Sequence, residues 1–374
     1  MRSAIAITIF AEKSPTATVE TEKKEARCAR CAADHGIGGR SDDFVAKATK
    51  GRNPVFILSL DFELMWGVRD VTTIKNYGSN ILGVRQAIPA MLKLFKQYNV
   101  NATWAAVGLL LFENKAELKR YIPSLLPTYI DANLSPYGGY LDKIGDNEKT
   151  DPYHYGYSLA AKIVATSGME LASHTFSHYY CLAGGQTGEQ FRSDLESSKQ
   201  ATKRFGQNPS SLVFPRNQVR SEYLHVCKSA GFISVRGNES HRMYHFTRGG
   251  IREAGRRFLR LADAYLNISG SNIFTPGADS MLTNIPSSRF FRPYHKSDDV
   301  FGWLRLHRIT GAMSRAASEG KVFHLWWHPH NFGTNLTENI SLLQVILKHF
   351  AGLRERFGMS SMTMSELASH TRKI

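Results

Sequence analysis

The sequence predicts an α/β fold in which a parallel sheet closes, or nearly closes, into a barrel. From residue 55 onward, short apolar runs typical of buried strands alternate with stretches of helical periodicity. Strands that alternate with helices indicate a parallel sheet. About six or more such units in one chain favour a barrel, and a length of 374 residues is sufficient for one barrel-sized domain.

Residues 1–53 differ from the rest of the chain. They mix Lys, Glu, Ala, Thr and Gly without sustained periodicity, which predicts a poorly ordered N-terminal extension. A start codon placed too early is the alternative. Cys28 and Cys31 form a lone CxxC there, which supplies only half of a structural zinc site. We therefore expect residues 54–374 to form the barrel domain.

The elements of that domain follow from the pattern of apolar residues. The first strand, Val55–Leu60, is a continuous apolar run, as expected for a strand buried on both faces. The further predicted strands cover residues 102–107, 169–173, 211–214, 232–235 and 322–327. Helices are predicted near residues 81–98, 157–167, 188–206, 220–230, 298–318 and 338–356. Between about 121 and 155, Pro and Gly residues break the pattern and predict a loop-rich insertion.

Composition limits the location and the partners of the protein. The net charge is +15, which favours attraction to anions such as acidic glycans or an anionic membrane face. The basic residues are scattered and no nucleic-acid-binding motif accompanies them, so no specific nucleic-acid partner is expected. Four cysteines make no disulfide framework for a chain of this size, and no apolar run has the length of a membrane span. We therefore expect a cytoplasmic location, and the oligomeric state stays open.

Side chains suited to catalysis follow four of the predicted strands. In order along the chain these are Asp61 and Glu63, His174 and His178, Arg216 and Asn217, and His328 and His330. Because the carboxyl ends of the strands of an α/β barrel meet at one rim, we expect these groups to share one active site.

His174 and His178 have a spacing that suits a shared metal ion. On a helical turn both rings lie on one face, whereas on an extended strand they would be separated by roughly 13 Å. The strand must therefore end at His174. Two imidazoles and one carboxylate make a common catalytic metal shell. Asp61 and Glu63 could supply that carboxylate and a second one to act as a base, although either could be a mere salt-bridge partner.

The order of these motifs resembles that of the polysaccharide deacetylase superfamily (carbohydrate esterase family 4, the NodB-homology domain). Asp61-Phe-Glu63 is similar to its first motif, Asp-x-Asp, with Glu in the second place. His174-Thr-Phe-Ser-His178 is similar to its His-[Ser/Thr]-x-x-His motif, and Leu325-Trp-Trp-His328 to its last motif. Phe214-Pro-Arg216 is similar to the arginine motif, although Asn217-Gln218 replaces the usual Pro-Tyr. The likeness spans roughly residues 54–370.

The resemblance implies a distorted (β/α) barrel of about seven strands that holds a divalent metal ion, expected to be Zn²⁺. It implies Asp61 as general base, Arg216 as its partner, and His328 as general acid, with His330 as a rival. The metal ligands would be Glu63, His174 and His178, with exchanged roles for Asp61 and Glu63 as an alternative. The implied reaction removes the N-acetyl group from an amino sugar in a polysaccharide, oligosaccharide or lipid-linked glycan, with a role in cell-envelope polysaccharide.

Candidates for contact with the sugar come from two places. The residues predicted to bind substrate are Trp66, Asp151, His154 and Asn217. The aromatic residues of the insertion suit either sugar recognition or a packed lid, and Trp326 and Trp327 suit either a sugar-stacking wall or the core. Two other functions stay open, namely hydrolysis of a small non-sugar amide and non-catalytic glycan binding.

Overall fold

The structure, a computed structural model, describes residues 53–244, 251–277, 281–296 and 298–372. Apart from Asn53, the predicted N-terminal extension lies outside these residues, as do Cys28 and Cys31. No helix in the described part of the chain combines the length and the apolar character that crossing a membrane requires.

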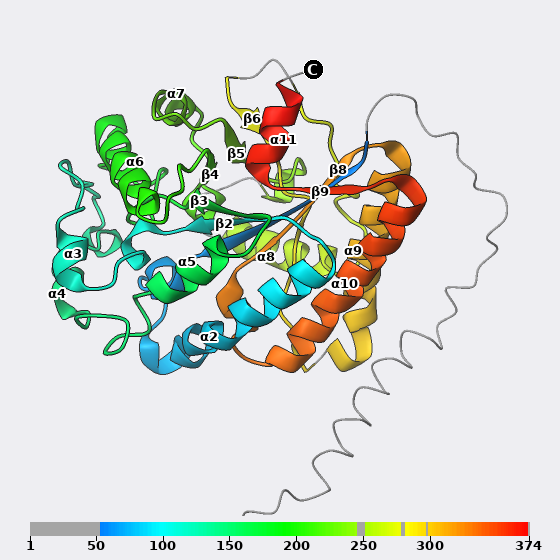
Figure 1. The fold of residues 1–374 in the computed structure, drawn as a ribbon, viewed down its shortest axis with the longest axis horizontal. Helices are drawn as coiled ribbons and strands as arrows, with labels where there is room; N and C mark the ends of the chain where they lie inside the picture. The colour runs from blue at the N-terminus through cyan, green and yellow to red at the C-terminus, as the bar shows by residue number, and fades with distance from the viewer. Residues whose placement is uncertain (1–52, 245–250, 278–280, 297, 373–374) are drawn as a thin grey trace, which may run out of the picture. The chain divides into compact units, whose positions relative to one another are not determined.

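A curled parallel sheet forms the centre of the fold (Figure 1). Its strands are β1 (Val55–Phe62), β2 (Ala102–Ala106), β3 (Met169–Ser173), β4 (Ser211–Val213), β5 (Ser234–Arg236), β6 (Thr283–Asn284), β7 (Arg289–Phe290) and β8 (Val322–Trp327). They are ordered β6-β5-β4-β3-β2-β1-β8-β7, and β9 (Ser360–Met362) pairs with the start of β1. The predicted α/β fold with a distorted barrel is confirmed.

The two edges of this sheet are joined by one continuous segment, Thr283–Phe290. Its first part pairs with β5, where the Ile285 N–H donates to the Val235 carbonyl and the Ser287 N–H to the Gly237 carbonyl. Its second part pairs with β8, where the Ser288 N–H donates to the carbonyl of His324. A single strand path that changes partner thus links both edges of the barrel.

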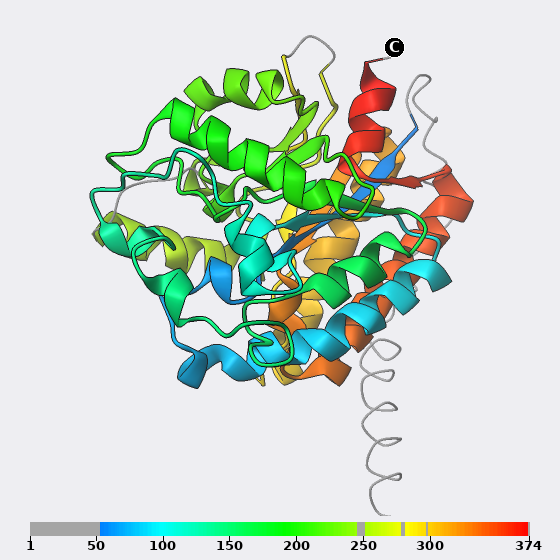
Figure 2. The ribbon, with the colours of Figure 1, turned by 60° about the vertical axis from the view of Figure 1, so that its left-hand side comes forward.

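Helices cover the outside of the sheet. The longer ones are α2 (Ile74–Gln97), α5 (Tyr157–Val164), α6 (Gly188–Lys203), α7 (Leu224–Ser229), α8 (Ile251–Asp263), α9 (Asp298–Glu319), α10 (Leu336–Phe357) and α11 (Met364–Thr371). Short turns include α3 (Lys115–Lys119), α4 (Tyr140–Lys143), η1 (Leu64–Gly67), η2 (Gly108–Leu110), η3 (Ala132–Leu134), η4 (Pro215–Asn217), η5 (Ser221–Tyr223), η6 (Arg242–Tyr244) and η7 (Pro329–Phe332). Figures 1 and 2 both show α2, α10 and α9 side by side.

Alternation along β1 separates the outer core from the barrel interior. Phe56, Leu58 and Leu60 pack outward in the large core shared with the helices. Val55 and Ile57 point inward, where Met364 and Leu367 of α11 join them at the N-terminal end of the barrel. The next two residues on the inward face are Ser59 and Asp61. The barrel is therefore apolar at the bottom and polar toward its C-terminal rim.

Candidate metal centre

The end of β1 places two carboxylates on one face. Asp61 and Glu63 are two residues apart, so they share the inward side of the strand. β1 ends at Phe62, and η1 turns the chain away directly after Glu63. Gly67 in that turn lies against the Glu63 carboxyl group, since a Cβ atom there would be 2.0 Å from Glu63 Cδ. Only glycine leaves room for this position of the carboxylate.

The loop after β3 brings the two histidines together without a helical turn. Thr175 (φ 62°) and His178 (φ 58°) adopt left-handed conformations, which are costly for residues other than glycine. Buried Asp194 of α6 holds the loop by accepting hydrogen bonds from the Phe176 N–H (2.6 Å), the Ser177 N–H (3.1 Å) and the Ser177 hydroxyl. The strand ends as the spacing predicted, but the predicted helical turn is wrong.

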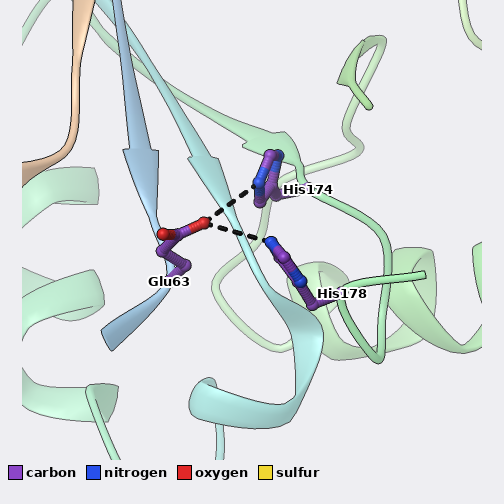
Figure 3. Close-up of side chains that lie close together, drawn as sticks. All are labelled: Glu63, His174 and His178. Carbon is purple, nitrogen blue, oxygen red and sulfur yellow. Dashed lines mark ion pairs between the residues drawn. The ribbon is translucent and has the colours of Figure 1, made fainter. Parts of the chain in front are cut away.

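The resulting cluster joins one carboxylate and two imidazoles (Figure 3). Oε2 of Glu63 is 3.3 Å from Nε2 of His174 and 3.3 Å from Nε2 of His178. All three side chains are buried. Nδ1 of His174 is 2.9 Å from the Val213 carbonyl, so its proton is held there and Nε2 presents a lone pair.

These residues fit a tetrahedral divalent ion. Zinc bonds of ~2.0–2.1 Å to nitrogen or oxygen separate two tetrahedral ligands by ~3.3 Å, which matches both distances from Glu63. Nε2 of His174 is also buried without a hydrogen-bond partner in the described part of the chain. A bare imidazole nitrogen beside a buried carboxylate is the donor set that a metal ion satisfies.

Electrostatics keep both carboxylates ionised. Burial raises the pKa of Glu63, but His328, His174 and His178 together lower it well below its ordinary value. Burial also raises the pKa of Asp61, while Arg236 and His174 lower it by more, so that the net shift is downward. Burial lowers the pKa of His178, which favours the neutral imidazole that a metal requires.

Arg236, not Arg216, is the partner of Asp61. Nη1 and Nη2 of this buried arginine, at the end of β5, donate to the two Asp61 oxygens at 2.6 and 2.7 Å. Arg216, whose backbone is left-handed (φ 54°), instead pairs with Asp70. The predicted Arg216–Asp61 pair is therefore wrong.

A chain of hydrogen bonds inside the barrel holds the Arg236 side chain in place. Its Nη1 also donates to the Ser59 hydroxyl at 3.0 Å, and that hydroxyl lies 2.8 Å from Nε2 of His324. Nδ1 of His324 in turn lies 3.2 Å from the Ile285 carbonyl, which assigns the proton to Nδ1. On the other side, the Asn217 side-chain carbonyl accepts from Nη2 of Arg236 at 2.9 Å. The Asp61 carboxylate is thus held in one orientation.

Arg236 was not among the predicted site residues. The predicted strand 232–235 ends immediately before it, and the rule that had selected the other strand ends applies equally here. Ser59 and His324 were missed because polar residues inside apolar strand runs carry no separate signal.

The two histidines after β8 differ in exposure. The His328 side chain is 24% exposed, and its Nε2 lies 3.8 Å from Oδ2 of Asp61 and 3.6 Å from Oε1 of Glu63. His330 is buried beside Tyr77, with Nε2 3.9 Å from Glu63 Oε1. Burial, with the neighbouring His328, lowers the pKa of His330 to about 3. Of the two, His328 is the one placed to exchange a proton with a substrate.

Three of the four predicted substrate-binding residues pack inside the protein. The Trp66 indole is fully buried and donates to the His154 carbonyl at 2.8 Å. His154 and Asp151 are buried and bonded to each other through Nδ1, and Tyr140 caps Nε2 of the histidine at 2.8 Å. These contacts secure the insertion against η1, and they give the buried side chains of Trp66, Asp151 and His154 partners within the protein. In the insertion the structure favours the packed lid.

A cavity of about 560 Å³ lies beside the cluster. His328, Trp326 and Asn217 belong to its lining, while Trp327 is buried in the core. The other lining residues are Arg216, Gln218, Asn238, Glu239, Tyr244, Arg257, Arg260, Ala264, Arg289, Phe290 and Arg292. Of the predicted substrate-binding residues, Asn217 is thus the one that reaches this space.

Comparison with known proteins agrees with this fold. The polysaccharide deacetylase family model matches residues 77–235, a span that includes both histidines of the cluster. Among curated proteins, no sequence matches the chain. The fold is a parallel α/β barrel with a buried Glu-His-His cluster at its C-terminal rim, and that cluster is a candidate metal site. Over residues 77–235, the chain is therefore similar to the polysaccharide deacetylase family.

Solved structures show the same fold at low identity. A protein from Mycobacterium smegmatis assigned as a polysaccharide deacetylase is 13% identical, with a TM-score of 0.53 over 87% of this chain and 96% of that one. A protein from Pseudomonas aeruginosa PAO1 with the same assignment is 11% identical, with a TM-score of 0.50 over 89% and 97%. Puue allantoinase is 11% identical, with a TM-score of 0.50 over 89% of this chain and 97% of that one. At such identities the likeness concerns the fold alone.

Proposed function

We propose that the protein is a metal-dependent hydrolase that removes the N-acetyl group from an amino sugar. The observation that carries this proposal is the position of a second, ionised carboxylate beside the metal-ligand cluster. Asp61 is held by Arg236 and is not part of the cluster, while Glu63 faces the two histidines. Metal-dependent amide hydrolysis uses both a metal ligand and a free base, and the two carboxylates of β1 can supply them.

The residues in and around the cluster have different catalytic roles. A divalent ion such as Zn²⁺, held by Glu63, His174 and His178, would polarise the amide carbonyl and acidify the attacking water. Asp61 takes the proton of that water, because its ionised oxygens are fixed at the rim by Arg236. His328 then donates a proton to the departing amine, so that water and the amide become acetate and a free amino sugar. Such acid catalysis contributes roughly 10²–10⁴ in rate.

The test begins with the metal content of the purified protein. We expect about one equivalent per chain, and acetate release from N-acetylglucosamine oligomers that a chelator stops and zinc restores. Measuring release from small non-sugar amides in parallel identifies the alternative hydrolase, which would cleave those and leave the sugars intact. A protein that takes up no metal under any loading condition, and whose glycan binding survives the chelator, would contradict the proposal and indicate a non-catalytic binding protein.

A further inference from the structure

Helix α8, at the outside of the fold in Figure 2, turns its polar side toward the protein. Asp263 in its last turn is fully buried and accepts hydrogen bonds from the Tyr244 hydroxyl at 2.7 Å and from Nη2 of Arg308 at 3.1 Å. Nη1 of Arg260 donates to the Met243 carbonyl at 3.2 Å, and the same side chain lines the cavity. The polar residues of α8 are therefore the ones that attach it to the barrel.

The apolar side of α8 is exposed. Phe258 and Leu261 precede Arg260 and Asp263, respectively, by two residues. Two residues turn a helix by roughly 200°, so each apolar side chain lies opposite a polar residue that holds α8 to the barrel. Phe258 is 69% exposed and Leu261 is 46% exposed. The helices of a globular domain ordinarily turn their apolar side toward the core, and in α8 this orientation is reversed.

The segments next to α8 extend the exposed apolar area. The loop after α8 packs against α9, since Nε of Arg308 donates to the Leu266 carbonyl at 3.1 Å and the Arg305 guanidinium lies 5.8 Å from the centre of the Tyr265 ring. Exposed apolar residues of α8, this loop and the first turn of α9 form what we call the apolar surface, namely Phe258, Leu261, Leu266, Ile268, Val300 and Phe301. They are between 41% and 69% exposed. Exposed apolar groups of this kind mark sites that bind a membrane or another protein.

We propose that the apolar surface docks onto an anionic lipid membrane. The net charge of the chain is +15, a sum from which every carboxylate is already subtracted, so attraction to an anionic surface does not depend on which arginines form ion pairs. A second copy of the chain would carry the same charge and would be repelled. Exposed Phe, Leu and Ile side chains then enter the boundary between headgroups and acyl chains, as they do in helices that lie along a membrane. This inference is independent of the proposed reaction.

Sedimentation with lipid vesicles tests the proposal on the unaltered, full-length protein. We would compare vesicles of phosphatidylcholine with vesicles in which about a third of the lipid is phosphatidylglycerol, at low and at high salt. The protein is expected to bind the anionic vesicles about tenfold or more tightly than the neutral ones, and high salt should remove most of this difference by screening the charges. Equal binding to both kinds of vesicle at low salt, or binding to neither, would overturn the proposal.

Two variants locate the contact. Phe258→Ser and Leu261→Ser should each weaken binding to anionic vesicles about tenfold, because each removes an apolar side chain that enters the lipid. Ile130→Ser is the matched control, since Ile130 is 84% exposed but lies in the insertion, outside the apolar surface. Urea unfolding should give the same free energy of unfolding for all three variants, because the three side chains are exposed.

Two results with these variants would contradict the proposal. Equal vesicle binding by the control and by the two variants of α8 would show that the apolar surface does not contact the lipid. A protein that sediments as a dimer without vesicles, becomes monomeric in Phe258→Ser and does not bind lipid would instead assign the apolar surface to a second copy of the chain.

Discussion

The two sides of the barrel mouth, which meet at the end of β1, are built on opposite principles. On the side of β3, the histidine loop is bonded within the chain, with Asp194 accepting three hydrogen bonds and Nδ1 of His174 directed at a carbonyl. On the side of β5, β7 and β8, a cavity of about 560 Å³ is lined by arginine, amide and aromatic side chains. The first side fixes the geometry of the metal ligands through hydrogen bonds within the chain, whereas the second side is an open cavity.

The same contrast separates the two carboxylates of β1. Asp61 and Glu63 share one face of one strand, yet a guanidinium holds the first and two imidazoles face the second. Their partners, not their position in the sequence, therefore decide which carboxylate acts as base and which binds metal. Variants that remove one partner at a time test this distinction.

The largest effect is expected from loss of a ligand. His174→Ala should abolish both metal binding and turnover, because two donors close only half of a tetrahedral shell. Metal analysis of the purified variant measures this directly. The matched control is His330→Ala, which removes another buried histidine beside Glu63 but lies outside the cluster, and it should keep its metal. Equal metal loss in both variants would contradict the assignment of ligands.

Asp61→Asn should separate metal binding from catalysis. The variant retains all three ligands and should bind one ion, while kcat falls by roughly 10²–10⁴ because no base accepts the proton of water. Acetate release and metal content, measured on the same preparation, check both parts. Loss of the metal in this variant would mean that Asp61 and Glu63 have exchanged roles.

The two arginines provide the next comparison. Arg236→Gln leaves a buried, unpaired Asp61 and should lower the free energy of unfolding by about 3–5 kcal/mol. Arg216→Gln should cost less than about 1 kcal/mol, since its side chain is 35% exposed. Urea unfolding measures both.

A double variant sharpens this result. Adding Asp61→Asn to Arg236→Gln should recover part of the loss, because no buried charge then remains unpaired. No recovery would show that the arginine stabilises the barrel through packing rather than through Asp61.

A further prediction concerns the dependence of stability on pH. Burial and Arg236 lower the pKa of His324 from 6.5 to about 3, so the unfolded chain binds a proton at this site that the folded chain rejects. Stability from His324 is therefore complete above pH 6.5 and falls as the pH decreases toward 3, by about 2 kcal/mol between pH 6.5 and 5. His324→Gln should flatten that part of the urea-unfolding profile. His225→Gln, a change at an exposed histidine of α7, should leave it unchanged.

The sequence predicted the parts of the fold that depend on local pattern. β1 and β8 are continuous apolar runs, and the residues that follow them were expected at the rim. β6 and β7 were not predicted, because Thr283-Asn284 and Arg289-Phe290 are too short and too polar to form a recognisable run. They exist because β5 and β8 leave backbone groups that the segment between them satisfies.

The candidate site was predictable in residue type and less so in pairing. Glu63, His174 and His178 come together, as the family resemblance implied. Whether Arg216 or Arg236 reaches Asp61 depends on backbone angles at two neighbouring strand ends, and the left-handed conformation of Arg216 has no sequence signal. Burial of Trp66 and His154 likewise follows from how the insertion folds onto η1, which is a tertiary contact.

The segment that joins the sheet edges also determines how the barrel opens. β6 and β7, with two residues each, are the shortest strands of the described sheet, so their amides should exchange with solvent before those of β1. Both edges contribute to the cavity, through Asn238 and Glu239 after β5 and through Phe290 and Arg292 around β7. A ligand bound in the cavity therefore contacts both sides of this segment. Its binding free energy adds to the free energy that holds the two edges of the sheet together. As more of the cavity is filled by ligand, the backbone amides of β6 and β7 should exchange with solvent more slowly.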